Sequence, residues 1–182
     1  MSASADLCCH PATPGLAVRR IRAEVEQVAR GILSLSFSIT ADRAGLRLPA
    51  PAAAQRVAGL WQHSCLEAFL QADGSDAYFE FNFSPSGAWA AYRFNSRRAD
   101  RTVPELTAPH LVIRHRPYGM TLTVRLSYEG LPEMANATTL CAGLAAVVED
   151  RQGGLSYWAL AHRAARPDFH DPATFTLQLP LP

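Results

Sequence analysis

Apolar and polar residues alternate along much of the chain with a period of two. Between residues 33 and 40, leucine, phenylalanine and isoleucine alternate with three serines and a threonine. Successive side chains of a β-strand point to opposite faces, so this pattern predicts a strand with one buried face and one face in water. Residues 21–26 alternate in the same way. Because the link between the two runs is short and ends in Gly31, we predict a hairpin.

The same period returns after a connection that is rich in alanine and proline. We expect this connection, residues 41–59, to hold one helical turn at residues 52–58. Turn signals made of glycine, proline, serine and aspartate separate the segments that follow. Further strands are predicted at residues 63–70, 78–83, 88–94, 111–115, 120–127, 140–149, 155–162 and 175–179.

Many short strands with regular turn signals predict an all-β fold, an antiparallel β-sandwich or jelly roll. The sequence has no βαβ alternation and no glycine-rich phosphate loop, which argues against a nucleotide-binding α/β fold. Residues 1–14 are small and polar and include two prolines, so we expect a flexible N-terminal arm. Residues 15–182 have the length of a single domain of ordinary size.

Composition narrows the class of partner. The chain has 182 residues, with 17 basic and 16 acidic side chains and a formal net charge of +1. This balance argues against nucleic-acid binding, which needs a concentrated positive face. All the basic residues are arginine, which we attribute to genome composition rather than to phosphate recognition.

No apolar run is long enough to cross a membrane, so we expect no membrane partner. No segment has the plan of a secretory signal. We therefore expect a cytoplasmic protein in which the four cysteines, Cys8, Cys9, Cys65 and Cys141, are reduced.

Polar residues of two predicted strands are candidates for a binding face. On residues 78–83, Tyr78, Glu80 and Asn82 share one face. A carboxylate beside an amide offers several acceptors and two donors, which suits sugar hydroxyls or a cation. The alternative is a solvated outer face or a network that ties loops together.

Glu67 lies in an otherwise apolar strand, where a buried carboxylate is costly unless it is paired. One interpretation is an ion pair with an arginine of the following polar loop, Arg97, Arg98 or Arg101. The other is a ligand-facing carboxylate with a raised pKa. Together with Glu80 it could carry out acid–base chemistry on a glycosidic bond.

The remaining candidates are histidines and tryptophans. His162, Asp168 and His170, with His63, are possible metal ligands, but their spacing matches no zinc signature, and we expect a hydrogen-bonded corner and no metal. Tryptophan rings stack on sugars or fill cores. Of Trp61, Trp89 and Trp158, the first and the last are the better candidates for a binding face.

Three blocks carry a resemblance to a known family: LWQHSCLEAFL, YFEFNFSPSGAWAAYRF and AVVEDRQGGLSYWALAHRAARPDFH. Together with the lead-in HPATP they resemble bacterial DOMON-like proteins, which are related to the family 9 carbohydrate-binding modules. The similarity covers residues 10–179. It implies a β-sandwich with jelly-roll character and a concave face that relatives use to bind sugars or haem.

This chain departs from those relatives in two respects. The carbohydrate modules are usually attached to secreted hydrolases, whereas this sequence reads as a lone domain. Haem-binding relatives use axial methionine and histidine ligands, and none of Met1, Met120 and Met134 matches a ligand position. We therefore expect no cofactor.

These observations together predict a non-catalytic module that binds a small polar ligand, a saccharide or a glycan fragment. Trp61 and Trp158 would stack on sugar rings. Hydrogen bonds would come from His63, Glu67, Glu80, Asn82 and His162.

Two other function classes stay open. One is an enzyme that acts on sugars or cell-wall precursors through its paired carboxylates, or through His162 with Asp168. The other is a structural or protein-interaction module. The sequence leaves the oligomeric state open.

Overall fold

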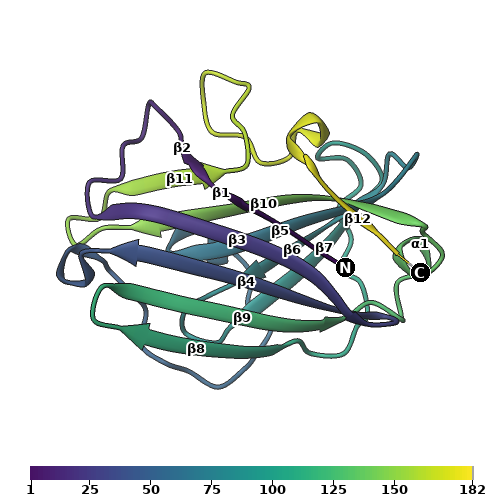
Figure 1. The fold of residues 1–182 in the computed structure, drawn as a ribbon, viewed down its shortest axis with the longest axis horizontal. Helices are drawn as coiled ribbons and strands as arrows, with labels where there is room; N and C mark the ends of the chain where they lie inside the picture. The colour runs from purple at the N-terminus through teal and green to yellow at the C-terminus, as the bar shows by residue number, and fades with distance from the viewer. Residues whose placement is uncertain (182) are drawn as a thin grey trace.

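The computed structural model describes residues 1–181, whose strands form two antiparallel sheets packed face to face (Figure 1). Sheet A has the strand order β1-β3-β4-β9-β8, and sheet B has the order β2-β11-β10-β5-β6-β7, with β12 also paired to β10. The predicted all-β sandwich is therefore confirmed. The strands of sheet A are β1 (Ser2–Asp6), β3 (Val18–Ala29), β4 (Ile32–Ala41), β8 (His110–Arg116) and β9 (Gly119–Ser127). Those of sheet B are β2 (Cys8–Cys9), β5 (Cys65–Ala72), β6 (Tyr78–Phe83), β7 (Trp89–Phe94), β10 (Thr139–Glu149), β11 (Leu155–Ala159) and β12 (Leu177–Pro180).

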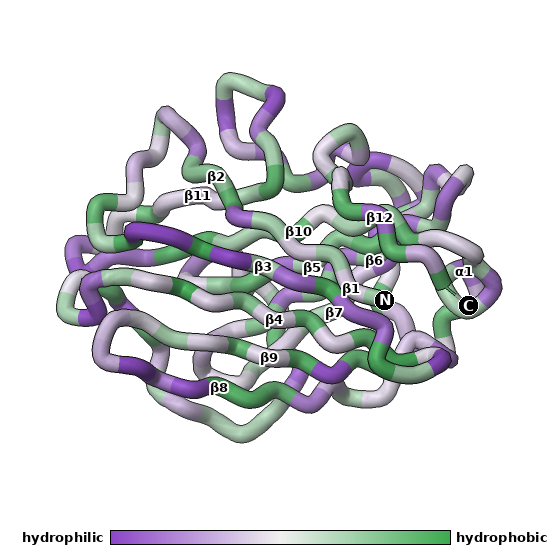
Figure 2. Tube along the Cα trace, viewed as in Figure 1, coloured by the Kyte–Doolittle hydropathy of each residue, from purple (hydrophilic) through white to green (hydrophobic). Residues whose placement is uncertain are grey.

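The main core lies between the two sheets. Alternate residues of each strand point inward, so Phe37 and Val124 of sheet A meet the cluster that also holds Phe81 and Ala146 of sheet B. Figure 2 shows the alternation of apolar and polar residues along β3 and β4. Burying these side chains supplies the main driving force for folding.

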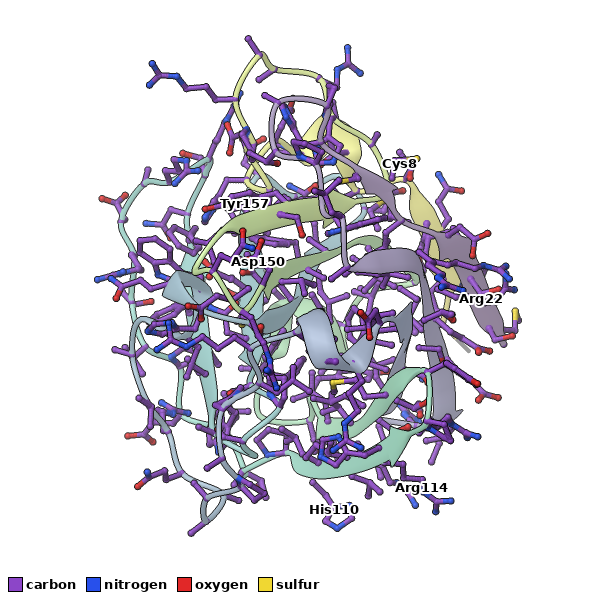
Figure 3. The ribbon with its side chains drawn as sticks, turned by 90° about the vertical axis from the view of Figure 1, so that its left-hand side faces the viewer. Cys8, Arg22, His110, Arg114, Asp150 and Tyr157 are labelled. Carbon is purple, nitrogen blue, oxygen red and sulfur yellow. The ribbon has the colours of Figure 1, made fainter. Side chains whose placement is uncertain are left out.

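The outer face of sheet A is polar and open to water. Arg22 of β3 and Ser38 of β4 are cross-strand partners, and both are exposed. Arg22 and Arg114 extend away from the ribbon in Figure 3. Ion pairs on this face, such as Arg20 with Asp6, are half in solvent and contribute little to stability.

Much of the outer face of sheet B is covered by protein. A second apolar cluster lies on it, and it includes Phe69, Tyr78, Phe94 and Phe175. Phe69 and Phe175 stack with ring centroids 5.7 Å apart. A Cβ added at Gly143 would lie 2.4 Å from the Phe175 ring, so this glycine leaves the space that the ring fills.

The connection between β11 and β12 provides much of this cover. Strand β5 occupies one edge of β10, so β11 and β12 share the other edge, at Ala145–Glu149 and Thr139–Ala142. The chain must leave the sheet after β11 and return to the same edge. Residues 160–176 make this excursion, which contributes Phe175 to the outer cluster and ends in a short 3₁₀ helix at Pro172–Thr174.

Two sequence expectations about local structure are wrong. Residues 1–14 do not form a flexible arm along their whole length, because Ser2–Asp6 pairs with β3 and Cys8–Cys9 pairs with β11. The helical turn expected at residues 52–58 does not form. Short helices lie instead at Arg43–Gly45, Leu60–Gln62 and Pro132–Ala135 (α1). No helix within residues 1–181 has the length and apolar character needed to span a membrane.

Candidate functional site: a pocket on the outer face of sheet B

A cavity of about 650 Å³ opens on the outer face of sheet B. Its floor crosses five consecutive strands of the sheet, from β11 to β7. Tyr157 of β11 lies beside Val147 of β10, and Glu80 of β6 lies beside Tyr92 of β7. Glu67 of β5 occupies the centre of the floor. Figure 3 labels Tyr157 on β11.

Three connections form the walls. Trp61 comes from the 3₁₀ helix at Leu60–Gln62, which follows Gly59 in the left-handed region with φ of 77°. Arg98 and Arg101 come from the connection after β7. Residues 166–170 come from the connection after β11 and include Arg166, Phe169 and His170. Segments that are far apart in sequence therefore meet over one sheet.

The two glutamates of the floor are neighbours. Glu67 is paired with Asn82 and Glu80 with Phe69 across β5 and β6. Glu67 and Glu80 are thus diagonal partners on one face, within reach of each other's charge. Their exposed fractions are only 3% and 5%, so both carboxyl groups are almost completely removed from bulk water.

Glu80 has partners that stabilise its ionised form. The Asn82 amide donates a hydrogen bond to Glu80 Oε1 over 2.6 Å, and His170 Nε2 lies 3.6 Å from Glu80 Oε2. Burial raises the pKa of Glu80, while the Asn82 hydrogen bond and the charges of Arg101 and Arg98 oppose that rise. The negative charge of the pair therefore belongs on Glu80.

Glu67 lacks such partners. Within residues 1–181, its Oε1 is the one buried side-chain nitrogen or oxygen atom without a hydrogen bond. Burial first, and the neighbouring Glu80 second, raise the pKa of Glu67 well above its ordinary value. Both effects favour the protonated carboxylic acid, which can donate one hydrogen bond into the pocket. Of the two interpretations of Glu67, the ion pair with Arg97, Arg98 or Arg101 is wrong, since within residues 1–181 no such pair to Glu67 lies within 4.0 Å.

His170 is held in one orientation by a short chain of hydrogen bonds. The Arg98 backbone N–H donates to the Tyr78 hydroxyl over 3.1 Å, and that hydroxyl lies 2.8 Å from His170 Nδ1. Burial, followed by the charge of Arg98, lowers the pKa of His170 to about 4, so the ring is neutral at neutral pH. With Nδ1 accepting from Tyr78, the ring N–H is on Nε2, which faces Glu80.

Asp168 anchors the arginine wall. Arg98 Nη2 donates to Asp168 Oδ1 over 2.9 Å, and Arg97 donates to the other carboxylate oxygen. These hydrogen bonds, with one from the His170 backbone N–H, outweigh burial and lower the pKa of Asp168 to about 2. The anchor thereby links the β7–β8 connection to the β11–β12 connection.

Aromatic rings line both ends of the floor. Trp61 is 49% exposed, although it lines the pocket, so part of its ring is available for contact. Tyr157 lies with its ring centroid 6.0 Å from that of Phe169. At the other end, the Arg101 guanidinium lies 5.0 Å from the centroid of Tyr92. Flat apolar surfaces therefore flank the buried carboxyl groups.

The structure brings some of the sequence candidates together. Trp61, Glu67 and Glu80 line the pocket, and Asn82 lies beneath it as the partner of Glu80. The Asn82 amide is also contacted by the Cys65 thiol, 3.8 Å from Asn82 Oδ1.

Three other candidates lie elsewhere, which corrects the predicted set. Trp158 is 7% exposed in the core between the sheets and donates to Ser156 Oγ, so it cannot stack on a ligand in the pocket. His63 Nδ1 lies 2.9 Å from Glu149 Oε2, outside the pocket. His162 Nε2 lies 2.9 Å from the Cys8 carbonyl oxygen and likewise does not line it.

The side chains of the candidate metal ligands are each engaged by another group of the protein. Asp168 binds arginines, His170 contacts Tyr78, and His162 contacts a backbone carbonyl. Met120 and Met134 are buried in the core between the sheets, so neither side chain reaches the pocket as a haem ligand would.

Sequence reasoning missed several pocket residues: Tyr92, Phe94, Arg166, Phe169 and Tyr157. Tyr157 had a usable signal, since it alternates with Trp158 and one of the two had to face outward. Arg166 and Phe169 had none, because only the tertiary fold places the connection after β11 over the sheet.

Comparisons with known proteins show the fold. No protein-family model and no curated protein matches this chain. A solved protein from Bacteroides uniformis, provisionally assigned as carbohydrate-binding, is similar with a TM-score of 0.71 and 15% identity over 99% of this chain and 85% of that one.

Two structures of a family 9 carbohydrate-binding module from Caldicellulosiruptor kristjanssonii are also similar, each with a TM-score of 0.53. The glucose complex is 11% identical over 90% of this chain and 76% of that one. The cellotriose complex is 10% identical over 94% and 83%. This chain therefore shares the β-sandwich of carbohydrate-binding modules.

Proposed function

We propose that the pocket on the outer face of sheet B binds a saccharide and that the protein is a non-catalytic carbohydrate-binding module. The observation that carries this proposal is the unpartnered Oε1 of Glu67, buried at the floor of an open pocket. A buried polar atom without a hydrogen bond costs about 1–3 kcal/mol. A ligand hydroxyl placed on the floor supplies the missing partner.

The rest of the pocket suits the same ligand. Glu80 and the protonated form of Glu67, which burial favours, together offer acceptors and one O–H donor, and sugar hydroxyls both donate and accept. The apolar C–H faces of a sugar ring pack on aromatic planes such as Trp61 and Tyr157. The fold shared with modules solved with glucose and cellotriose supports this class of ligand. A DOMON-like relationship and a bacterial origin belong to the same proposal, since they rest on the sequence resemblance.

A sugar-acting enzyme is the second candidate, because two carboxyl groups with raised pKa values face one pocket. A glycosidase needs one such carboxyl as its acid and a second, ionised carboxylate as nucleophile or base. The pKa of Glu67 is raised the more strongly of the two, so Glu67 suits the role of the acid and Glu80 that of the carboxylate. Prolonged incubation of an oligosaccharide with the protein distinguishes the two functions. A binding module leaves the oligosaccharide intact, whereas a hydrolase shortens it.

Calorimetric titration with glucose, cellotriose and related saccharides tests the binding proposal. We expect saturable binding of at least one sugar, and a Trp61→Ala variant that binds it about tenfold more weakly because a stacking surface is lost. Tyr118→Ala is the matched control, since Tyr118 is 78% exposed at the turn between β8 and β9 of the other sheet. The control should leave the affinity unchanged.

Two results would overturn the proposal. One is the absence of binding to every sugar of the panel. The other is equal affinity of the wild type and Trp61→Ala, which would place the bound sugar elsewhere. Recovery of shortened cellotriose, with the shortening lost in Glu80→Gln, would establish the enzyme instead.

A further inference from the structure

The pocket separates two kinds of polar group. The carboxyl groups of Glu67 and Glu80 lie at the floor and are buried. The guanidinium-bearing side chains of Arg98, Arg101 and Arg166 line the pocket from its walls, and all three residues are exposed. A ligand that fills the cavity therefore meets hydrogen-bonding groups at one end and positive charge at the other.

The positive charges of the three wall arginines differ in how far acidic side chains neutralise them. Arg98 shares the single carboxylate of Asp168 with Arg97, so that group of three charges keeps a net positive charge. Arg101 lies over the Tyr92 ring and has no acidic partner within 4.0 Å among residues 1–181. The same holds for Arg166 within that part of the chain. Two guanidinium groups are thus available to a ligand.

The lining of the pocket is positive even when both glutamates are counted as ionised, because three arginines line it with two carboxyl groups. The raised pKa of Glu67 favours its neutral form, which increases this excess. We attribute the use of arginine as the sole basic residue type to genome composition, so it is no evidence for an anionic ligand. The positions of the three arginines are specific, since the side chains come from two different connections and meet at one cavity.

Resting on the proposed function, we propose that the saccharide is anionic, a sugar ring that carries a carboxylate or a phosphate. Its hydroxyls would contact Glu67 and Glu80 at the floor, and its anionic group would contact Arg166 and Arg101 at the wall. Guanidinium groups bind both anions through paired N–H donors. The net charge of +1 for the whole chain hid this local excess.

Calorimetry with four ligands tests the inference: glucose, glucuronic acid, glucose 6-phosphate and inorganic phosphate. At low salt we expect at least one of the two anionic sugars to bind about tenfold or more tightly than glucose, a difference that charge-assisted hydrogen bonds can supply. This advantage should shrink at high salt, because the arginines are exposed to screening. The sugar acid and the sugar phosphate distinguish the two sources of the anion.

Arginine variants identify which guanidinium group binds the anionic group of the sugar. Arg166→Met retains the aliphatic part of the side chain but removes the charge. In this variant the dissociation constants of the neutral sugar and the anionic sugar should become nearly equal. Arg163→Met is the control, since Arg163 is exposed on the same connection but does not line the pocket. It should leave both constants unchanged.

The outcomes separate this inference from the proposed function. Equal binding of glucose and both anionic sugars overturns the inference and leaves the saccharide site standing. A preference that survives in Arg166→Met and in Arg101→Met also overturns it. Inorganic phosphate that binds as tightly as glucose 6-phosphate overturns it as well, since the sugar then contributes nothing. Failure of every sugar to bind overturns the proposed function itself.

Discussion

The outer faces of the two sheets carry similar kinds of residue in different surroundings. On sheet A, serines, threonines and charged side chains such as Ser38 and Arg22 are exposed. On sheet B, Glu67, Glu80 and Asn82 hold equivalent outward positions but are buried beneath two connections. A polar side chain on an open sheet keeps its water, whereas one on a covered sheet loses it.

This difference indicates where to look for function. Polar residues on the open face need no explanation beyond solubility. On the covered face each must find a partner, and most do: Asn82 with Glu80, Tyr78 with His170 and Arg98. Glu67 does not. Loss of solvent around a group that stays unpaired therefore distinguishes a candidate site from an ordinary surface.

The largest expected effect concerns the apolar cover of sheet B. Phe69 is buried on the outer face and contacts the rings of Phe175 and His170. We expect Phe69→Ala to lower the free energy of unfolding by about 3–5 kcal/mol, as for a residue of the inter-sheet core. Chemical denaturation measures the change.

Two other variants provide the reference values for Phe69→Ala. Phe37→Ala, in the core between the sheets, should cost a similar amount. Ser38→Ala, on the open face of sheet A, should change stability by less than about 0.5 kcal/mol. If Phe69→Ala behaved like Ser38→Ala, the outer face of sheet B would not be a second core.

A smaller effect concerns the dependence of stability on pH. Because the pKa of Glu67 is raised in the folded state, the folded protein holds this proton at pH values where the unfolded chain releases it. The resulting stabilisation is complete below the unfolded pKa of about 4.3 and is lost as pH rises toward the folded pKa. Glu67→Gln is neutral throughout, so its melting temperature relative to wild type should rise between pH 5 and pH 8.

Glu26→Gln on the exposed face of sheet A is the control for this experiment. Its difference in melting temperature from wild type should be small and equal at both pH values. A Glu67→Gln difference that is also the same at pH 5 and pH 8 would show that Glu67 is not a protonated buried acid.

The fold could be predicted from the sequence to a large extent because it follows a local pattern. The alternation at residues 33–40 and 120–127 became β4 and β9, which pair with each other. The strand Ser2–Asp6 could not be predicted in this way, since its small side chains carry little signal. It forms through backbone pairing with β3 at the edge of sheet A.

The site could be predicted only in part. Glu67 was visible because a carboxylate in an apolar strand needs a partner, and Glu80 because it shares a strand face with the Asn82 amide. The prediction of Trp158 is wrong and its neighbour Tyr157 lines the pocket, because aromatic character alone does not say which face of a strand is outward. Arg166 and Phe169 come from a connection whose path depends on the pairing of β10 with both β11 and β12. That pairing is long-range, and the local sequence does not encode it.

Fluorine NMR of protein labelled with 5-fluorotryptophan tests the central claim most directly. The chain has three tryptophans: Trp61 lines the pocket, while Trp89 and Trp158 are buried between the sheets. A Trp61→Phe variant identifies the Trp61 resonance. During titrations with glucose, cellotriose and glucuronic acid, at least one sugar should shift the Trp61 resonance to saturation and leave the other two in place. A sugar-dependent shift of Trp158 without Trp61, or no shift with any of the three sugars, would contradict the assignment of this pocket as a saccharide site.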